Sequence, residues 1–178
     1  MKKVLFILSC TLVLSSCGDG KKQAEPEVVT VDVNAKEVYT AADTKASFDD
    51  PNATALFQHY IDLKTALVNT DATTTKAIAA KMVTASDSLT GMESLNAAAA
   101  AIAATDDVEA QRVQFVPLTE GIELMVDKHL ASGTIYKQYC PMAFDFEGGF
   151  WLSNSKEIYN PYFGDKMLHC GKVDSKIE

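Results

Sequence analysis

The sequence predicts a mainly α-helical fold, an antiparallel bundle of three to four helices with a small C-terminal module of strands and loops. Apolar residues recur at intervals of three and four between residues 51 and 133, which is the spacing of one helix face. Candidate caps and breakers divide this region into short segments, as expected for antiparallel neighbours. After Ser132-Gly133 the pattern changes to short alternating runs with many aromatic residues, which favours strands.

The N-terminus has the features of an export signal. Residues 1–3 are basic at two positions, and the apolar run up to Leu14 is shorter than the about 20 residues needed to cross a bilayer. Residues 15–17 resemble the cleavage box of bacterial lipoproteins. That resemblance implies removal of residues 1–16, lipid on Cys17, and a lipid-anchored protein of the cell envelope that faces the periplasm or the cell surface. An ordinary signal peptide is the alternative.

Residues 17–50 are expected to form an acylated tether, because their first part is polar and shows no period. Loss of Lys2 and Lys3 with the signal leaves 14 basic against 24 acidic residues, a formal charge of −10. Nucleic acid attracts basic surfaces, so this charge argues against a nucleic-acid partner. The remaining partner that the N-terminus predicts is the membrane, held through Cys17.

The helical region, residues 51–133, contains four predicted segments. Asp50 and Pro51 start the first segment as N-cap and first helical residue. Residues 69–71 end it and cap the second, and Gly91 separates the second from an alanine-rich third segment.

The fourth helical segment carries its own start, stop and interruption signals. Asp106 and Glu109 have the spacing of a capping box, and Ser132-Gly133 marks the end. Pro117 predicts a kink or a break, because proline removes a backbone donor inside a helix.

Residues 134–178, which we term the C-terminal cassette, are predicted to pack on the helices as part of one domain, residues 51–178. Residues 134–139 and 150–152 favour short strands, with a glycine-containing turn between them. Residues 166–169 have the composition of a single helical turn.

The cassette holds four sulfur side chains that could bind a soft metal. Cys140 and Met142 lie on the same side of an extended segment, since side chains repeat every two residues there. Met167 and Cys170 share a face of a helical turn at i, i+3. If the chain folds back, the four ligands converge, with His169 as a further candidate. Thiolates and thioethers select copper(I) and similar soft metals.

A disulfide between Cys140 and Cys170 is the alternative reading of the same residues. Exported proteins meet an oxidising compartment, and a bridge closing about 30 residues would stabilise the fold by roughly 3–4 kcal/mol. In that case the protein is a non-enzymatic interaction domain, and the aromatic side chains of Trp151, Tyr162 and Phe163 are candidates for a surface that docks a partner. The two readings can coexist as a reduced and an oxidised state.

No enzyme is expected from this sequence. A serine–histidine–acid arrangement cannot be argued from the spacing, and no glycine-rich phosphate loop is present.

Several short motifs, taken together, resemble a known family. They are Arg112-x-x-Phe115-x-Pro117-Leu118-Thr119, Cys140-Pro141-Met142-Ala143, Trp151-Leu152-Ser153, Asn160-Pro161-Tyr162-Phe163-Gly164 and Met167-x-x-Cys170-Gly171. This combination, over roughly residues 50–175, resembles the domain of unknown function 3347 family, with threonine at 119 where serine is expected. Members of that family are exported bacterial proteins, often lipoproteins, and the domain also occurs on periplasmic adaptors of heavy-metal efflux systems. The resemblance implies a role in handling copper or a related metal, with an efflux adaptor or pump component as partner, and it implies no reaction.

Overall fold

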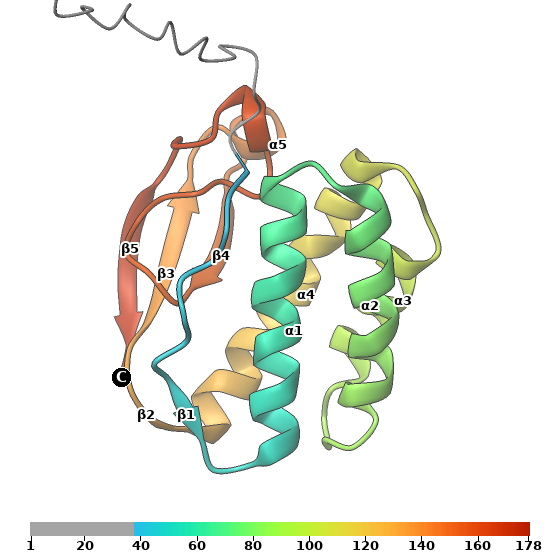
Figure 1. Ribbon diagram of the computed structural model, residues 1–178, viewed down its shortest axis with the longest axis vertical. Coiled ribbons are helices and arrows are strands. Elements are labelled where there is room, and N and C mark those ends of the chain that lie inside the picture. Colours follow the sequence, from blue (N-terminus) through green and yellow to red (C-terminus); the bar gives the residue numbers. More distant parts are fainter. Residues whose placement is uncertain (1–37) are drawn as a thin grey trace, which may run out of the picture. The chain divides into compact units, whose positions relative to one another are not determined.

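The computed structural model describes residues 38–178, and Figure 1 shows a predominantly helical domain with small antiparallel sheets. The predicted signal sequence, the lipidation site at Cys17 and the tether up to residue 37 lie outside the described residues. Within residues 38–178, no helix combines the length and the apolar character needed to cross a membrane.

Four helices make up the first part of the domain: α1 (Pro51–Val68), α2 (Ala72–Ser86), α3 (Glu93–Ala103) and α4 (Val108–His129). Each packs on the next along the chain, and α4 returns to contact α1 (Figure 1). The predicted caps of the first two helices are confirmed, because Asp50 accepts a hydrogen bond from the Asn52 N–H and Asp71 from the Thr74 N–H.

One expectation for α4 was wrong. Asp107 is the N-cap in place of Asp106, since it is the Asp107 carboxylate that accepts from the Glu109 N–H. Of the predicted kink or break at Pro117, the break does not occur, because the helix is continuous from Val108 to His129. Pro117 removes a hydrogen bond to the carbonyl of Val113, which lies on an exposed face where water can take the place of the missing donor.

Two small sheets complete the fold. β1 (Ser47–Phe48) pairs with β2 (Leu130–Ser132), and a three-stranded antiparallel sheet has the order β4 (Gly149–Ser153), β3 (Ile135–Cys140), β5 (Lys172–Ile177). The two predicted cassette strands are confirmed as β3 and β4. Residues 166–169 do not form a helical turn of their own, because the 3₁₀ turn η1 (Gly164–Lys166) ends before Met167.

One core joins the helices to the cassette. Tyr60 of α1 is fully buried, and its hydroxyl accepts a hydrogen bond from the Leu152 N–H of β4 at 2.9 Å and bonds the Thr119 hydroxyl of α4 at 3.0 Å. Trp151, Leu152 and Tyr162 of the cassette belong to the same buried cluster as the helix stripes. Burial of this shared apolar surface holds the two parts together.

The expected tether is partly built into this domain. Residues 38–46, which we term the strap, run along α1 and β4, and β1 follows directly (Figure 1). Tyr39 is buried, and its backbone N–H and carbonyl both bond the Asn69 side chain at 2.9 Å. The packed domain therefore begins near residue 38, well before the expected boundary at residue 50.

Candidate functional site

The two cysteines of the cassette lie side by side. Cys140 ends β3 and Cys170 stands just before β5, and because these strands pair with Tyr139 opposite Lys172, the two thiols meet across the ladder. Their sulfurs are 3.3 Å apart and both are free. That separation is longer than the about 2.05 Å of a disulfide and shorter than the roughly 3.8 Å between two ligands of one tetrahedral metal.

The surroundings of Cys170 favour its protonated thiol. Cys140 is fully buried. Partial burial raises the pKa of the Cys170 thiol, and its hydrogen bond with Cys140 raises it further. Metal binding or oxidation at this pair must therefore remove protons, which makes both processes pH-dependent.

The two predicted thioether ligands line a neighbouring groove. Met142 and Met167 share a groove of about 410 Å³ with apolar and charged side chains: Glu109, Arg112, Ala143, Phe144, Asp145, Phe146, Tyr162, Phe163 and Lys166. Neither Cys140 nor Cys170 belongs to its lining. The structure thus brings the thiols together and the thioethers together, in adjoining places.

His169 lies at the surface and is held by two contacts. Its Nδ1 bonds the Ile158 carbonyl at 2.9 Å, and its ring meets Tyr159 edge to face at 5.2 Å between centroids. A proton on Nδ1 leaves Nε2 as the nitrogen able to ligate. Within residues 38–178, histidine, cysteine, aspartate and glutamate form no group of three or more that could hold a metal.

The predicted aromatic docking surface is corrected by the structure. Trp151 is 0% exposed and Tyr162 is 5% exposed, whereas Phe163 is half-buried. The Trp151 N–H donates to the Gln138 side chain at 2.6 Å, and the Tyr162 hydroxyl donates to the Phe150 carbonyl. These rings can be buried because their polar atoms find partners inside the protein.

The most exposed aromatic side chain of this region is Phe146, at 76%, and Phe150 is exposed to 39%. It sits in the short element α5 (Ala143–Phe146), where Phe144, Asp145 and Phe146 all have left-handed backbone angles, with φ of 51°, 54° and 73°. Such angles cost roughly 1–2 kcal/mol for each non-glycine residue. Bonds from the Glu147 and Gly148 N–H groups to the carbonyls of Phe144 and Ala143 close the turn.

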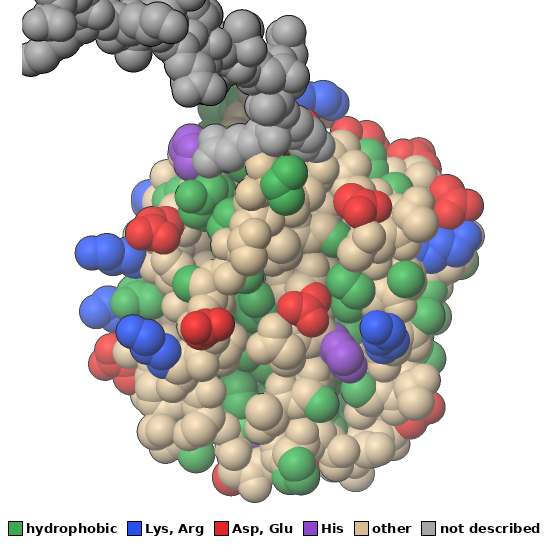
Figure 2. Space-filling view, viewed as in Figure 1, with side chains coloured by type: hydrophobic (Ala, Val, Ile, Leu, Met, Phe, Trp, Pro, Cys, Tyr) green, Lys and Arg blue, Asp and Glu red, His purple; other side chains and the backbone are tan. Residues whose placement is uncertain are grey.

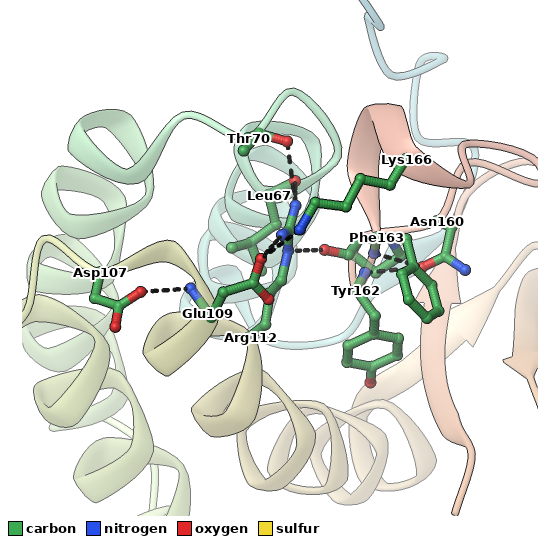
Figure 3. Close-up of polar contacts among 10 residues, drawn as sticks. Leu67, Thr70, Asp107, Glu109, Arg112, Asn160, Tyr162, Phe163 and Lys166 are labelled. Carbon is green, nitrogen blue, oxygen red and sulfur yellow. Dashed lines mark hydrogen bonds and ion pairs between the residues drawn. The ribbon is translucent and has the colours of Figure 1, made fainter. Parts of the chain in front are cut away.

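Arg112 positions the cassette on the helices, as Figure 3 shows. It is 2% exposed, and its guanidinium donates to the carbonyls of Pro161 and Leu67, the Thr70 hydroxyl and the Glu109 carboxylate at 2.8–3.2 Å. These bonds join α4, the end of α1 and the loop before η1 in one network. The sequence interpretation noted Arg112 only as part of a motif and missed this positioning role.

Lys64 was also missed. It is fully buried in α1, although charged residues are rarely buried without an opposite charge. The sequence does indicate that Lys64 is buried, because Lys64 stands on the apolar stripe of this helix, four residues after Tyr60 and three before Leu67.

Comparisons with known proteins identify the helical region. Residues 56–133 match the family model described as Protein of unknown function (DUF3347). No curated protein and no solved structure matches the chain significantly. The matched span contains the Arg112–Thr119 motif and ends before the sulfur pair. This match supports the DUF3347 family for residues 56–133 of the chain.

Proposed function

We propose that this protein is a membrane-anchored lipoprotein of the cell envelope that binds copper(I) or a similar soft metal. The observation that carries the proposal is the pair of free thiols at 3.3 Å. Export is the expectation from the N-terminal sequence. Two thiols at this distance need to separate by roughly half an ångström to bind one metal ion. Soft sulfur ligands of this type select copper(I) over magnesium or calcium.

The chain's own residues would act by binding and release, without catalysis. Cys140 and Cys170 lose their protons and ligate. Met142 and Met167, in the adjoining groove, are the candidates to take over the ion one ligand at a time, and His169 is a further candidate at the surface. An adaptor or pump component of a heavy-metal efflux system is the proposed receiver. The helices would form an antiparallel bundle that carries the site.

Anaerobic copper(I) titration against a competing chelator tests this function. Trp151 is the only tryptophan, and a Cβ added at Gly171, next to Cys170, would lie 2.9 Å from its ring. Its fluorescence should therefore change with occupancy. We expect one-to-one binding by the reduced protein, its loss in Cys140→Ser/Cys170→Ser, and weaker binding in Met142→Leu/Met167→Leu.

The control for this titration is Leu124→Ser, at an exposed position of α4 that carries no sulfur ligand. It should bind as the wild type does. Equal competition by the wild type and the double cysteine variant would exclude the thiols as ligands and overturn the proposal.

A structural disulfide is the second candidate, and the same short distance favours it. Cys140 and Cys170 would each lose a proton and together two electrons, which a disulfide oxidant of the envelope accepts by thiol–disulfide exchange. The protein would then be an interaction domain, with Phe146 and Met142 as its exposed apolar residues. Thiol counting on protein isolated from the envelope separates the candidates. A stably oxidised pair without metal supports the disulfide.

A further inference from the structure

Lys64 is a buried amine without an opposite charge. It is 0% exposed, and none of the ion pairs formed within residues 38–178 includes it. Its Nζ donates to the Ser153 hydroxyl of β4 at 3.2 Å and to the Tyr39 hydroxyl of the strap at 3.4 Å. A hydroxyl can accept from an ammonium or donate to a neutral amine, so both contacts are available to either form of Lys64.

The strap provides the cover over Lys64. The ammonium lies 5.4 Å from the centroid of the Tyr39 ring, which stacks on Tyr159 at 4.0 Å. Two hydrogen bonds to Asn69 fix the Tyr39 backbone, and the Asn154 side chain donates to the Ala42 carbonyl. Figure 2 views the domain from this side and shows acidic and basic side chains at the surface of this face.

The residues that follow the strap are attached to the domain by contacts of their own. β1 pairs with β2, the Ser47 and Ser132 hydroxyls are 2.7 Å apart, and the Asp49 N–H donates to the His129 carbonyl at 3.0 Å. The Asp49 carboxylate also lies 2.9 Å from Nδ1 of His129, and protonation of His129 turns this contact into an ion pair. Residues 38–46 can therefore lift while β1 stays in place.

We propose that Lys64 and the strap form a proton-coupled latch, in which the strap closes over the neutral amine and opens when Lys64 takes up a proton and is hydrated. Burial is what couples the two events, because a charged ammonium without a counter-charge is far more stable in water than inside the protein. Opening frees nine residues, which would add about 30 Å of extended chain to the link with the N-terminal segment.

The titration window follows from the same burial. Burial lowers the pKa of Lys64 to about 7 in the closed state, from the ordinary 10.5 that it regains in water. Between these values the open state holds one more proton, so the opening constant should rise up to about tenfold per pH unit as the pH falls from 9.5 to 7. Below pH 7 both states are protonated, and the constant should level off.

The other titratable groups near the latch do not produce this profile. On the strap, burial and the nearby Tyr159 and Glu157 raise the pKa of Tyr39 to about 12, so its hydroxyl stays neutral throughout the window. Ser153 is uncharged. Glu157 reaches the latch through its charge near Tyr39, and His169 reaches it only through Tyr159.

Hydrogen exchange tests the latch on the whole mature chain. Amide exchange of the strap, corrected for the intrinsic rates, is measured from pH 5.5 to 9.5. We expect the opening constant at Tyr39 to increase at least tenfold between pH 9.5 and 7, to stay level below pH 7, and to be independent of pH in Lys64→Met. His169→Gln should keep the wild-type profile.

A second measurement does not depend on the folding of Lys64→Met. Slow acylation of the Lys64 amine, followed by mass spectrometry, should accelerate strongly in Tyr39→Ala, which removes the cover. A strap opening constant that is the same at pH 7 and 9.5 in the wild type would overturn the latch. The same pH profile in Lys64→Met would assign it to another group. Neither result bears on the copper titration, so the two proposals fail independently.

Discussion

At the scale of single residues, the domain contains two buried basic side chains whose polar atoms find partners in different ways. Arg112 has a carboxylate and three further acceptors, whereas Lys64 has two hydroxyls and no opposite charge. The planar guanidinium can bond several acceptors in fixed directions, which a lysine ammonium cannot reproduce. Arg112 therefore stabilises the closed fold, and Lys64 limits the stability of the strap.

Replacement of Arg112 should be strongly destabilising. Arg112→Met removes the side-chain donor from the buried carbonyl of Pro161 and leaves the Leu67 carbonyl with the Thr70 N–H as a backbone donor, and we expect a loss of about 3–5 kcal/mol in the free energy of unfolding. Arg112→Lys should recover only part of it. Urea denaturation measures the change. Lys166→Met, which removes the exposed contact with Glu109, is the control and should stay within about 0.5 kcal/mol.

Replacement of Lys64 should change the pH dependence of global stability. An unfolded chain holds the Lys64 proton up to pH 10.5, whereas the folded protein releases it near pH 7. The unfolded state binds more protons between these values, so the free energy of unfolding should rise with pH, by at most about 1.4 kcal/mol per unit. Denaturation at pH 7, 8 and 9 should show this slope in the wild type. A slope retained in Lys64→Met would contradict the assignment.

At the scale of elements, close contact between α3 and α4 determines where α4 lies. α3 is alanine-rich, and Gly121 of α4 faces Leu95, so that a Cβ added at Gly121 would lie 2.6 Å from the Leu95 Cβ. The small side chains let the two helix backbones approach closely. This contact places α4, which carries Arg112 and Thr119, against α1 and the cassette.

Gly121→Ala weighs helix propensity against packing. Alanine gains about 1 kcal/mol of propensity inside a helix, but the clash with Leu95 forces α3 and α4 apart, at about 1–3 kcal/mol. We expect a net loss of stability. The double variant Gly121→Ala/Leu95→Gly lacks the Leu95 Cβ and so removes the 2.6 Å contact, and in a double-mutant cycle the two changes together should cost less stability than the sum of the single changes. A single variant that melts at a higher temperature than the wild type would show that the helices can move apart freely.

At the scale of the whole molecule, the helices and the cassette share one core. Tyr60, Thr119 and the Leu152 N–H are joined by hydrogen bonds, and Trp151 and Tyr162 are buried among helix residues. The matched family span ends at residue 133 and lacks this cassette packing. A chain that ends there would expose the faces of α1 and α4 that the cassette covers.

Truncation tests whether that span folds alone. We expect residues 38–133 to unfold without a cooperative transition and to show little near-UV circular dichroism, because they lose the apolar surface buried against β4 and the loop before η1. Residues 38–178 serve as the control and should unfold cooperatively. Equal transition midpoints for the two chains would mean that the cassette is a separate module.

The sequence by itself determined the local features of this protein: the helical stripes, the caps at Asp50 and Asp71, and the strands around Tyr139 and Trp151. These follow from periodicity and from bonds between residues close in the chain. It also pointed to Cys140 and Cys170 as a pair, but strand register alone decided that their sulfurs touch while Met142 and Met167 line a separate groove.

Only the tertiary structure decided which side chains are covered. Aromatic residues look alike in a sequence whether they form a surface or a core, so Trp151 and Tyr162 were assigned wrongly. The strap likewise looked like a linker, because its packing depends on Asn69 and Tyr159, residues 30 or more positions away. Burial is a sum of contacts from distant segments, and it is burial that turns Lys64 from a surface charge into a proton-sensitive group.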